Sequence, residues 1–338
     1  MKKFLAVLLV LVLVLSVVGC GSKSDSQSGD AGDAKEYKFT LACDSPEDSV
    51  TYLYAKKFKE EVEKATNGQA TIQIFPNGTM GSDVEAAESC QNGEIDFVAS
   101  TTAPMVNFIP ELAVFDMPSV FSDIQTARKV VDGDFFNKLS AVYEKNGFKI
   151  LGFADQGFRE MSTNKVIQSI DDFKGQKIRT MENPYHIAYW RALGANPTPM
   201  AFSEVYIGLQ QGTIDAQENP YEVTVGAKLY EQQKYIINTN HVLHLVSMVQ
   251  NLDKFNSLPE EISSAIAESA NTAKLWAREQ ADTRINERIE IMEANDTEII
   301  DLSPELMQEM KEKAAPVYDI IREKIGDELV DAMLEAAK

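Results

Sequence analysis

Two arginines and one asparagine are residue types that could hold a small anion. Arg179 lies near the end of a short predicted strand, Arg159 follows the apolar segment 148–153, and Asn219 follows the strand predicted at 214–216. A guanidinium presents paired N–H donors that match a carboxylate, and an Asn amide adds a donor and an acceptor without charge. These side chains would suit a carboxylate ligand, although an arginine in such a position is by itself more often a surface or structural residue than a ligand clamp.

Sequence signatures of catalysis and of metal binding are missing. The chain contains no G-x-S-x-G, Walker, G-x-G-x-x-G or H-E-x-x-H motif. His186, His241 and His244 form no ligand pattern with the cysteines, so each is interpreted as a core or surface histidine and no cofactor is expected. We therefore predict a binding protein and not an enzyme. A secreted hydrolase is the enzymatic alternative, because glycosidase carboxylates need not be neighbours in sequence.

The charge of the chain narrows its partners. The formal net charge is −20, which argues against binding to nucleic acid because the phosphate backbone repels such a surface. An anionic small molecule is not excluded, since exposed charges are screened beyond about 8 Å at physiological salt. A few arginines inside a cleft can therefore set the local field.

The predicted elements alternate between strands and helices, which favours an α/β fold with parallel strands. The predicted strands are 37–42, 70–74, 95–99, 148–153, 176–180 and 214–216, and helices are expected to begin near 50, 82, 184 and 204. Ser82 and Glu85 form a capping box, and Ser203 is the expected cap of the helix 204–211. The segments 91–96 and 210–215 echo each other. The echo is short enough to arise by chance, but with the repeated order it suggests two similar lobes.

The carboxyl-terminal part is predicted to be helical. Residues 259–294 contain no internal Pro or Gly, and a helix of this length would span about 50 Å, which exceeds one lobe. Ser257 and Glu260 predict a capping box at its start. Two helices, 304–325 and 327–337, are expected to follow, with Pro316 kinking or breaking the first of them.

The amino terminus predicts export. Two lysines precede the apolar stretch 4–18, which is too short to span a membrane and fits a signal peptide at 1–19. Gly19-Cys20 resembles a bacterial lipobox, so Cys20 is the predicted lipidation site, with an ordinary signal peptide as the alternative. The Gly, Ser and Asp-rich segment 20–34 would then form a flexible tether. Cys43 and Cys90 could form one disulfide or remain buried thiols, and the thiols are favoured.

Several longer motifs resemble one family. The segments 175–179, 194–206 and 209–220, together with 80–83 and 110–118, are similar to the DctP-type solute-binding proteins of tripartite ATP-independent periplasmic (TRAP) transporters. The resemblance covers nearly all of the chain after residue 34. It implies an α/β fold of two lobes with a cleft between them and a long helix spanning both. Lobe I would comprise 35–156 plus 245–284, and lobe II would comprise 157–244 plus 285–338.

The resemblance also implies roles for individual residues. The ligand would be a small organic acid of the C4-dicarboxylate, sugar acid or keto acid type, and Arg179 would form the salt bridge to its carboxylate. Arg159 and Asn219 would assist, Phe202 would pack on the ligand, and Thr101 would supply a polar contact from lobe I. The protein would be a monomer on the outer face of the cell membrane, anchored through lipid on the amino-terminal cysteine, and would deliver the acid to a TRAP permease.

Two departures from the family pattern affect these expectations. Ala216 stands where many members have Gly, which would alter the backbone near the site, and the segment 42–48 is unlike the sialic-acid branch. A binding protein of an ATP-driven importer, or a ligand-sensing partner of a sensor kinase, is the alternative with the same two-lobed shape.

Overall fold

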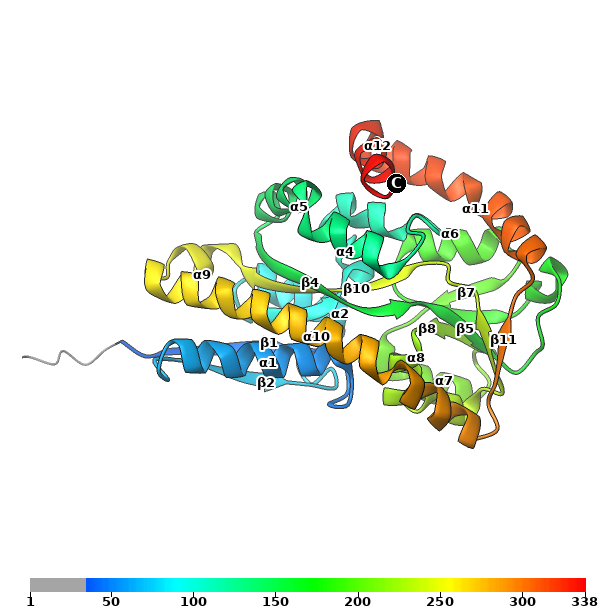
Figure 1. Cartoon of the computed structure of the whole chain (residues 1–338), viewed down its shortest axis with the longest axis horizontal. Helices are drawn as coiled ribbons and strands as arrows, with labels where there is room; N and C mark the ends of the chain where they lie inside the picture. Colours follow the sequence, from blue (N-terminus) through cyan, green and yellow to red (C-terminus); the bar gives the residue numbers. More distant parts are fainter. Residues whose placement is uncertain (1–34) are drawn as a thin grey trace, which may run out of the picture. The chain divides into compact units, whose positions relative to one another are not determined.

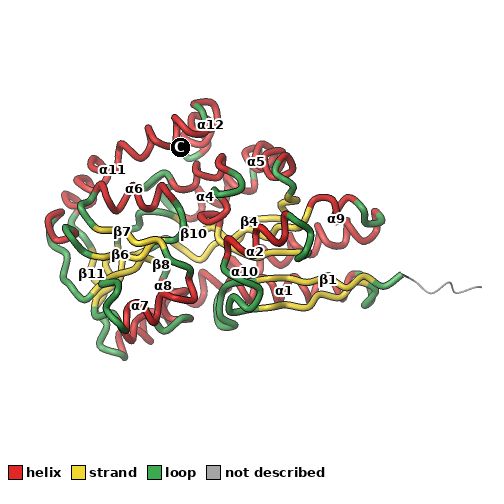
Figure 2. The backbone as a smooth tube through the Cα atoms, turned by 180° about the vertical axis from the view of Figure 1, so that it is seen from behind, coloured by secondary structure: helices red, strands yellow, loops and turns green. Residues whose placement is uncertain are grey.

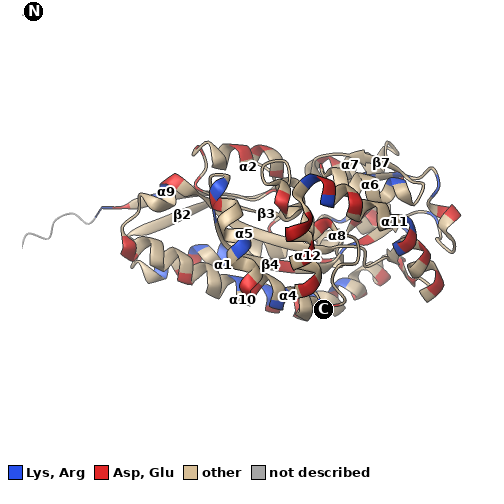
Figure 3. Ribbon diagram, turned by 90° about the horizontal axis from the view of Figure 1, so that it is seen from above, with Lys and Arg blue, Asp and Glu red and all other residues tan. Residues whose placement is uncertain are grey.

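The computed structural model describes residues 35–338, which form two β-sheets flanked by helices (Figure 1). The predicted signal peptide, the lipidation site Cys20 and the tether lie outside the described residues. Among residues 35–338, no helix combines the length and the hydrophobicity needed to cross a membrane. Acidic residues occur on helices beside both sheets, with Lys and Arg interspersed among them (Figure 3).

The first sheet has the strand order β2-β1-β3-β10-β4, and the second has the order β11-β9-β5-β8-β6-β7. The strands of the first sheet are β1 Tyr37–Ala42, β2 Ala70–Phe75, β3 Phe97–Thr101, β4 Phe148–Phe158 and β10 Leu243–Asn251. Those of the second sheet are β5 Glu160–Thr163, β6 Lys177–Thr180, β7 Asn196–Pro199, β8 Ala216–Asn219, β9 Tyr235–Asn238 and β11 Glu298–Asp301. Strands β1, β2 and β3 are parallel, as are β6, β7 and β8, so each sheet has the parallel part that the alternating pattern predicted.

Helices cover both sheets. They are α1 Val50–Ala65, α2 Asp83–Gln91, α3 Thr102–Met105, α4 Ile124–Asp132, α5 Asp134–Lys145, α6 Pro184–Ala192, α7 Val205–Gln210, α8 Tyr221–Gly226, α9 Leu252–Asn256, α10 Glu260–Ala294, α11 Pro304–Ile325 and α12 Asp327–Ala336. Short 3₁₀ segments are η1 Pro110–Asp116, η2 Ile170–Phe173, η3 Phe202–Glu204 and η4 Leu229–Gln232. The predicted capping box at α2 is confirmed, because Ser82 and Glu85 exchange side chain–backbone hydrogen bonds.

Two long strands connect the sheets. β4 has 11 residues and continues past the predicted end at 153 to Phe158, where the chain enters β5 of the second sheet. β10 returns the chain from β9 to the first sheet and pairs antiparallel with both β3 and β4. Figure 2 shows β4 and β10 running between β1 on one side and β6, β7 and β8 on the other. The two sheets are thus linked by crossing strands rather than by one flexible linker.

Helix α10 lies along both sheets, as the sequence predicted (Figure 1). It has 35 residues and packs on α1 and β4 of the first sheet and on α8 beside the second. The predicted capping box at its start is wrong. The Ser257 hydroxyl donates to the Lys254 carbonyl at 2.7 Å, because Ser257 closes the preceding helix α9, and Pro259 is the residue before α10.

Helix α11 continues through Pro316 without a break. Of the two predicted effects of Pro316, a kink or a break, the break does not occur, although a proline inside a helix costs about 3 kcal/mol. One face of α11 is buried against α6 and η1, through Leu306, Met310, Ala314 and Val317 on both sides of the proline. This apolar burial offsets the lost hydrogen bond. Helix α12 then packs on η1 and α5.

Two local boundaries in the second sheet differ from the prediction. Ser203 lies inside the 3₁₀ segment η3 and caps no helix, because α7 begins only at Val205. The strand predicted at 214–216 starts instead at Ala216 and runs to Asn219. Ile214 is buried in a small cluster with Val205 and Leu209, so it packs under the turn and does not belong to the sheet.

Both cysteines of the described residues are free, buried thiols, in agreement with the favoured alternative. Cys43 lies just after β1, and Cys90 lies near the end of α2. Burial raises the pKa of each thiol to about 12, so neither is reactive at neutral pH.

Candidate functional site

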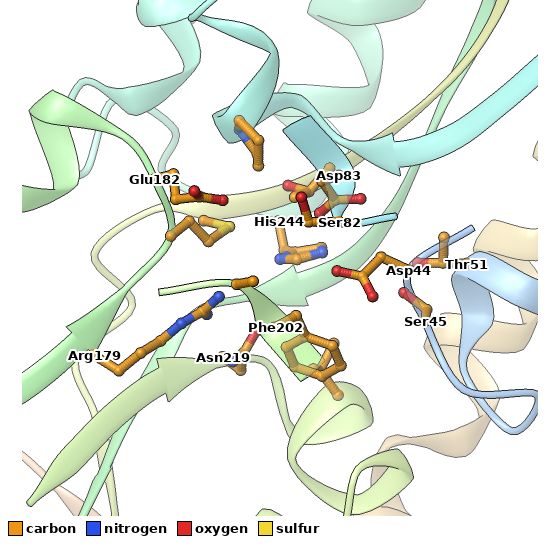
Figure 4. Close-up of a pocket in the computed structure, with 15 residues that line it drawn as sticks. Asp44, Ser45, Thr51, Ser82, Asp83, Arg179, Glu182, Phe202, Asn219 and His244 are labelled. Atoms are coloured by element: carbon orange, nitrogen blue, oxygen red, sulfur yellow. The ribbon is translucent and has the colours of Figure 1, made fainter. Parts of the chain in front are cut away.

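A cavity lies between the two sheets and takes side chains from both (Figure 4). Its empty space is about 500 Å³, part of it open to solvent. The first sheet and its helices contribute Asp44, Ser45, Thr51, Ser82, Asp83, Thr101 and Pro104, whereas the second contributes Arg179, Met181, Glu182, Ala201, Phe202, Asn219 and Val223. His244 reaches the cavity from the connecting strand β10.

Arg179 is the cation of this cavity. It lies in β6, where Ile178 faces the core, and its side chain points into the cavity with only 2% of its surface exposed (Figure 4). Its Nε and Nη2 donate to the Met200 carbonyl at 3.0 and 2.6 Å. Within the described part of the chain no carboxylate forms an ion pair with it. Burial, together with the neighbouring Arg159, lowers the pKa of Arg179 to about 10, so it is charged at neutral pH.

Asn219 and Phe202 flank this guanidinium. Asn219 is the last residue of β8, where it pairs with Glu160 of β5, and its Nδ2 donates to the Gln217 side chain at 2.6 Å. The Phe202 ring lines the cavity with its centroid 5.9 Å from the guanidinium carbon of Arg179. The structure therefore brings together three of the side chains that the sequence selected, namely a cation, an amide and an apolar wall.

Thr101 also lines the cavity, as the resemblance implied. It is the last residue of β3 and precedes the short helix α3, and its side chain makes no capping hydrogen bond there. Its hydroxyl is thus not engaged in the cap, and Thr101 lines the same cavity as Arg179.

Arg159 does not line the cavity, in contrast to the expectation that it would assist at the ligand. It connects β4 to β5 and is 1% exposed. Its guanidinium is paired with the Glu218 carboxylate, to which Nη2 donates at 2.9 Å, and it contacts Nδ1 of His244. The physical reason is that Glu218 is also fully buried, and an ionised, buried carboxylate is stable only when a cation is paired with it.

His244 was interpreted from the sequence as a core or surface histidine, and it is both buried and part of the cavity wall. Burial and the adjacent Arg159 lower its pKa well below the usual value, so its ring is neutral. Because Nδ1 faces the Arg159 guanidinium, that nitrogen must accept and Nε2 must carry the proton. The tautomer follows from this contact, and it leaves His244 with one N–H donor.

The other two histidines belong to the layer behind the cavity. His241 Nε2 lies 3.0 Å from Glu218 Oε2, and His186 Nε2 lies 3.0 Å from Asp116 Oδ1. Burial opposes ionisation of Glu218, but Arg159 and the two histidines outweigh it and hold its pKa well below the ordinary value. This buried network fixes the carboxyl end of β8, and so the position of Asn219.

Three carboxylates in the cavity wall were missed by the sequence analysis. Asp44 follows β1, Asp83 is the first residue of α2, and Glu182 follows β6. Desolvation raises the pKa of Asp44 to about 7, and the nearby Glu182 and Glu85 add to the rise, whereas Arg179 opposes it. Desolvation and Asp44 likewise raise the pKa of Asp83 well above its ordinary range. The place of Asp44 beyond the carboxyl end of a strand was the signal that could have identified it.

Among the described residues, no group of three or more His, Cys, Asp or Glu side chains could hold a metal ion.

Comparisons with known proteins agree with this architecture. The sequence model of bacterial extracellular solute-binding protein family 7, DctP, matches residues 42–324. The 2,3-diketo-L-gulonate-binding periplasmic protein YiaO of Escherichia coli is 35% identical over 228 residues, which cover 67% of this chain and 70% of that protein. The C4-dicarboxylate-binding periplasmic protein DctP of Rhodobacter capsulatus is 33% identical over 287 residues, covering 83% and 85%.

A solved structure has the same fold. The crystal structure of a TRAP periplasmic solute-binding protein from Polaromonas, bound to D-erythronate, superposes with a TM-score of 0.84 at 31% identity and covers 88% of this chain and 98% of that one. The two-lobed α/β fold expected from the sequence is thereby confirmed. The chain therefore belongs to the DctP family of bacterial extracellular solute-binding proteins.

Proposed function

We propose that this protein captures a small carboxylate-bearing organic acid outside the cytoplasmic membrane and delivers it to a TRAP-type permease. The observation that carries the proposal is Arg179, a fully buried guanidinium that faces a cavity and has no carboxylate ion-pair partner among residues 35–338. A buried charge without a counter-ion is costly, and a ligand carboxylate would supply the missing partner. Relatives that bind diketogulonate, C4-dicarboxylates and erythronate support this class of ligand.

In this proposal the side chains around Arg179 have distinct roles. Arg179 holds the ligand carboxylate, while the Asn219 amide and the N–H of His244 orient it. Phe202 covers the apolar part of the ligand, and Thr101 adds a hydroxyl from the first sheet. Arg159 acts from behind the wall as a positioning residue, because it fixes His244 and Glu218 and does not face the cavity.

The two sheets would act as the two lobes, 35–156 plus 245–284 and 157–244 plus 285–338. Closure of these lobes would expel water and strengthen the salt bridge to Arg179, because Coulomb interactions grow as the local dielectric falls. The ligand can shift the equilibrium towards the closed form only by as much as it prefers that form. The monomeric closed protein would then dock on the permease, held near the membrane by lipid on Cys20.

Calorimetry with a panel of organic acids tests the binding step. We expect Arg179→Ala to weaken the affinity for the best acid by about thirty-fold or more, since truncating one partner of a buried charge pair costs about 2–5 kcal/mol. Arg191→Ala is the matched control, because Arg191 is exposed and lies on the neighbouring helix α6. An unchanged affinity in a correctly folded Arg179→Ala variant would refute the assignment.

Delivery is tested separately with the permease reconstituted in lipid vesicles. Uptake of the labelled acid should require this protein and an ion gradient and should proceed without ATP. Uptake that depends on ATP hydrolysis would instead identify the partner as an ATP-driven importer.

A further inference from the structure

The cavity wall opposite Arg179 is acidic. Asp44 and Asp83 lie across the cavity from the guanidinium, and Glu182 lies at its side (Figure 4). Asp44 is only 5% exposed. The Asp83 N–H approaches its carboxylate and lowers its pKa, but within the described residues neither carboxylate oxygen accepts a hydrogen bond of good geometry. A buried carboxylate with so few donors has lost most of its hydration without replacement, so a donor from a ligand would stabilise it.

The backbone around Asp44 fixes the carboxylate in this position. The loop after β1 is tied to the loop after β2 by Gly78 N–H to the Cys43 carbonyl at 3.3 Å and by Asn77 N–H to the Ser45 carbonyl at 3.1 Å. Gly78 has a φ of +64°, and a Cβ at this position would lie 2.4 Å from Asp44 Oδ1. The Asp44 carboxylate therefore occupies the space that the missing side chain of Gly78 leaves, and any larger residue at position 78 would displace it.

The two walls select opposite chemistry. Arg179 favours a carboxylate, whereas an additional negative charge near Asp44 would be repelled by the ionised carboxylates of this wall. A hydroxyl or ammonium group at the same place would donate to Asp44 and offset its lost hydration. A ligand that matches both walls therefore has a carboxylate at the end near Arg179 and a hydrogen-bond donor at the end near Asp44.

We propose that the ligand is a monocarboxylate whose far end carries hydrogen-bond donors, either hydroxyl or ammonium groups, and that Asp44 discriminates against dicarboxylates of the same length. This proposal rests on the function proposed above and narrows its ligand class. Asp83 strengthens the discrimination, because it lies close enough to Asp44 for each to disfavour ionisation of the other.

The discrimination depends on pH. The charged groups facing Asp44 are Arg179, Asp83, Glu182 and Glu85. Desolvation raises the pKa of Asp44 to about 7, so Asp44 carries a proton in mildly acidic solution and is ionised above pH 7. A protonated Asp44 can itself donate to a second carboxylate. Rejection of dicarboxylates should therefore be strongest above pH 7 and should weaken as the pH falls.

The proposal is tested by calorimetry, with matched pairs of acids titrated into the full chain. Gluconate with glucarate, and threonate with tartrate, differ only in a terminal hydroxymethyl or carboxylate group, and 4-hydroxybutanoate, 4-aminobutanoate and succinate form a third set. At pH 8 we expect the monocarboxylate of the best-bound set to bind at least about ten-fold more tightly than the dicarboxylate of the same set. The comparison of the hydroxyl with the amine in the third set distinguishes the two kinds of donor.

Variants and pH assign the effect to Asp44. In Asp44→Asn the preference at pH 8 should fall to within a few-fold, while Asp319→Asn, an exposed carboxylate on α11, should leave it unchanged. In the wild-type protein the preference for the monocarboxylate should also become smaller at pH 5.5. This measurement needs no variant. The inference about Asp44 would be overturned if the dicarboxylates bound as tightly as the matched monocarboxylates at pH 8, or if the preference survived in Asp44→Asn. Either result would leave the proposed function intact. If no acid of either class depends on Arg179, the proposed function itself fails.

Discussion

Two buried arginines of this protein have opposite electrostatic situations. Arg159 is paired with Glu218, whereas Arg179 forms no ion pair among the described residues and donates its hydrogen bonds to a backbone carbonyl. The difference separates a structural charge from a charge that is available to a ligand. Nothing in the residue type distinguishes them, since both follow or end strands of similar apolar character.

The first prediction concerns this pair. Removing Arg159 takes away the strongest cationic partner of the buried Glu218 and leaves it only histidine partners, so we expect Arg159→Met to lower the free energy of unfolding by about 3–5 kcal/mol. Arg179→Met breaks no ion pair of the described residues and should change the stability of the ligand-free protein far less. Urea unfolding of both variants and of wild type measures the contrast. Equal destabilisation by the two substitutions would contradict the separation of their roles.

The second prediction concerns the pH dependence of stability. The folded-state pKa of Asp44 is raised to about 7 from an ordinary value of 3.8, so the unfolded chain loses this proton first as the pH rises. Asp44 therefore lowers the stability of the ligand-free protein progressively between about pH 4 and pH 7. Asp44→Asn should match wild type near pH 4 and exceed it at pH 8, by an amount on the order of a few kcal/mol. Denaturant midpoints at both pH values check the sign, and a constant difference would reject it.

At the scale of elements, α10 connects the two sheets through a face of small residues. Ala270, Ala273 and Ala277 are fully buried where α10 packs on α1 and β4, and their size allows the helix to approach the sheet closely. The sequence pattern identified the helix correctly, and the packing explains why alanines recur along it.

The third prediction tests this close approach. We expect Ala273→Leu to destabilise the protein by about 1–3 kcal/mol, because extra methylene groups in a packed interface force side chains and backbone apart. Leu275→Ala is the control on the same helix, since Leu275 is 54% exposed and its loss should change stability by no more than about 0.5 kcal/mol. Thermal unfolding distinguishes the two, and a silent Ala273→Leu would show that α10 is loosely packed there.

At the scale of the whole described body, an ion-pair cluster links segments beside the two sheets. Asp48, in the loop after β1, pairs with Arg284 at 2.7 Å and with Arg288 at 2.9 Å on α10. Arg288 also pairs at 2.8 Å with Glu222 on α8, beside the second sheet. Asp48 lies outside the cavity, so a change there would affect ligand binding only through the arrangement of the two sheets.

The fourth prediction uses this cluster. Asp48→Ala should weaken the apparent affinity by about two- to five-fold, because the Asp48 side chain is 62% exposed and exposed ion pairs contribute about 0.2–1 kcal/mol. The loss arises from a smaller population of the closed form and should appear as faster ligand release. Stopped-flow measurements follow the release, with Asp319→Asn as the control. An unaltered release rate would show that the cluster does not stabilise closure.

Sequence periodicity was sufficient for elements whose burial is set locally. The strands near 37–42 and 70–74 follow from side-chain alternation, the α2 capping box from its helix start signal, and the long α10 from a stretch without internal Pro or Gly. The predicted caps at Ser203 and Ser257 are wrong, and the helix does not break at Pro316, because neighbouring elements decided those positions. A preceding helix claimed Ser257, and burial of α11 outweighed the cost of its proline.

For the site, the sequence by itself determined the family, the cation Arg179 and its neighbours Asn219 and Phe202, since these stand in long and specific motifs. Only the tertiary structure decided that Arg159 forms an ion pair with Glu218 behind the cavity wall. It also decided that the carboxylates Asp44, Asp83 and Glu182 line the same cavity as Arg179. The physical reason is that electrostatics depends on distance and dielectric in space. Asp44 and Arg179 are far apart along the chain, and only the crossing strands that bring the two sheets together place them on opposite walls of one cavity.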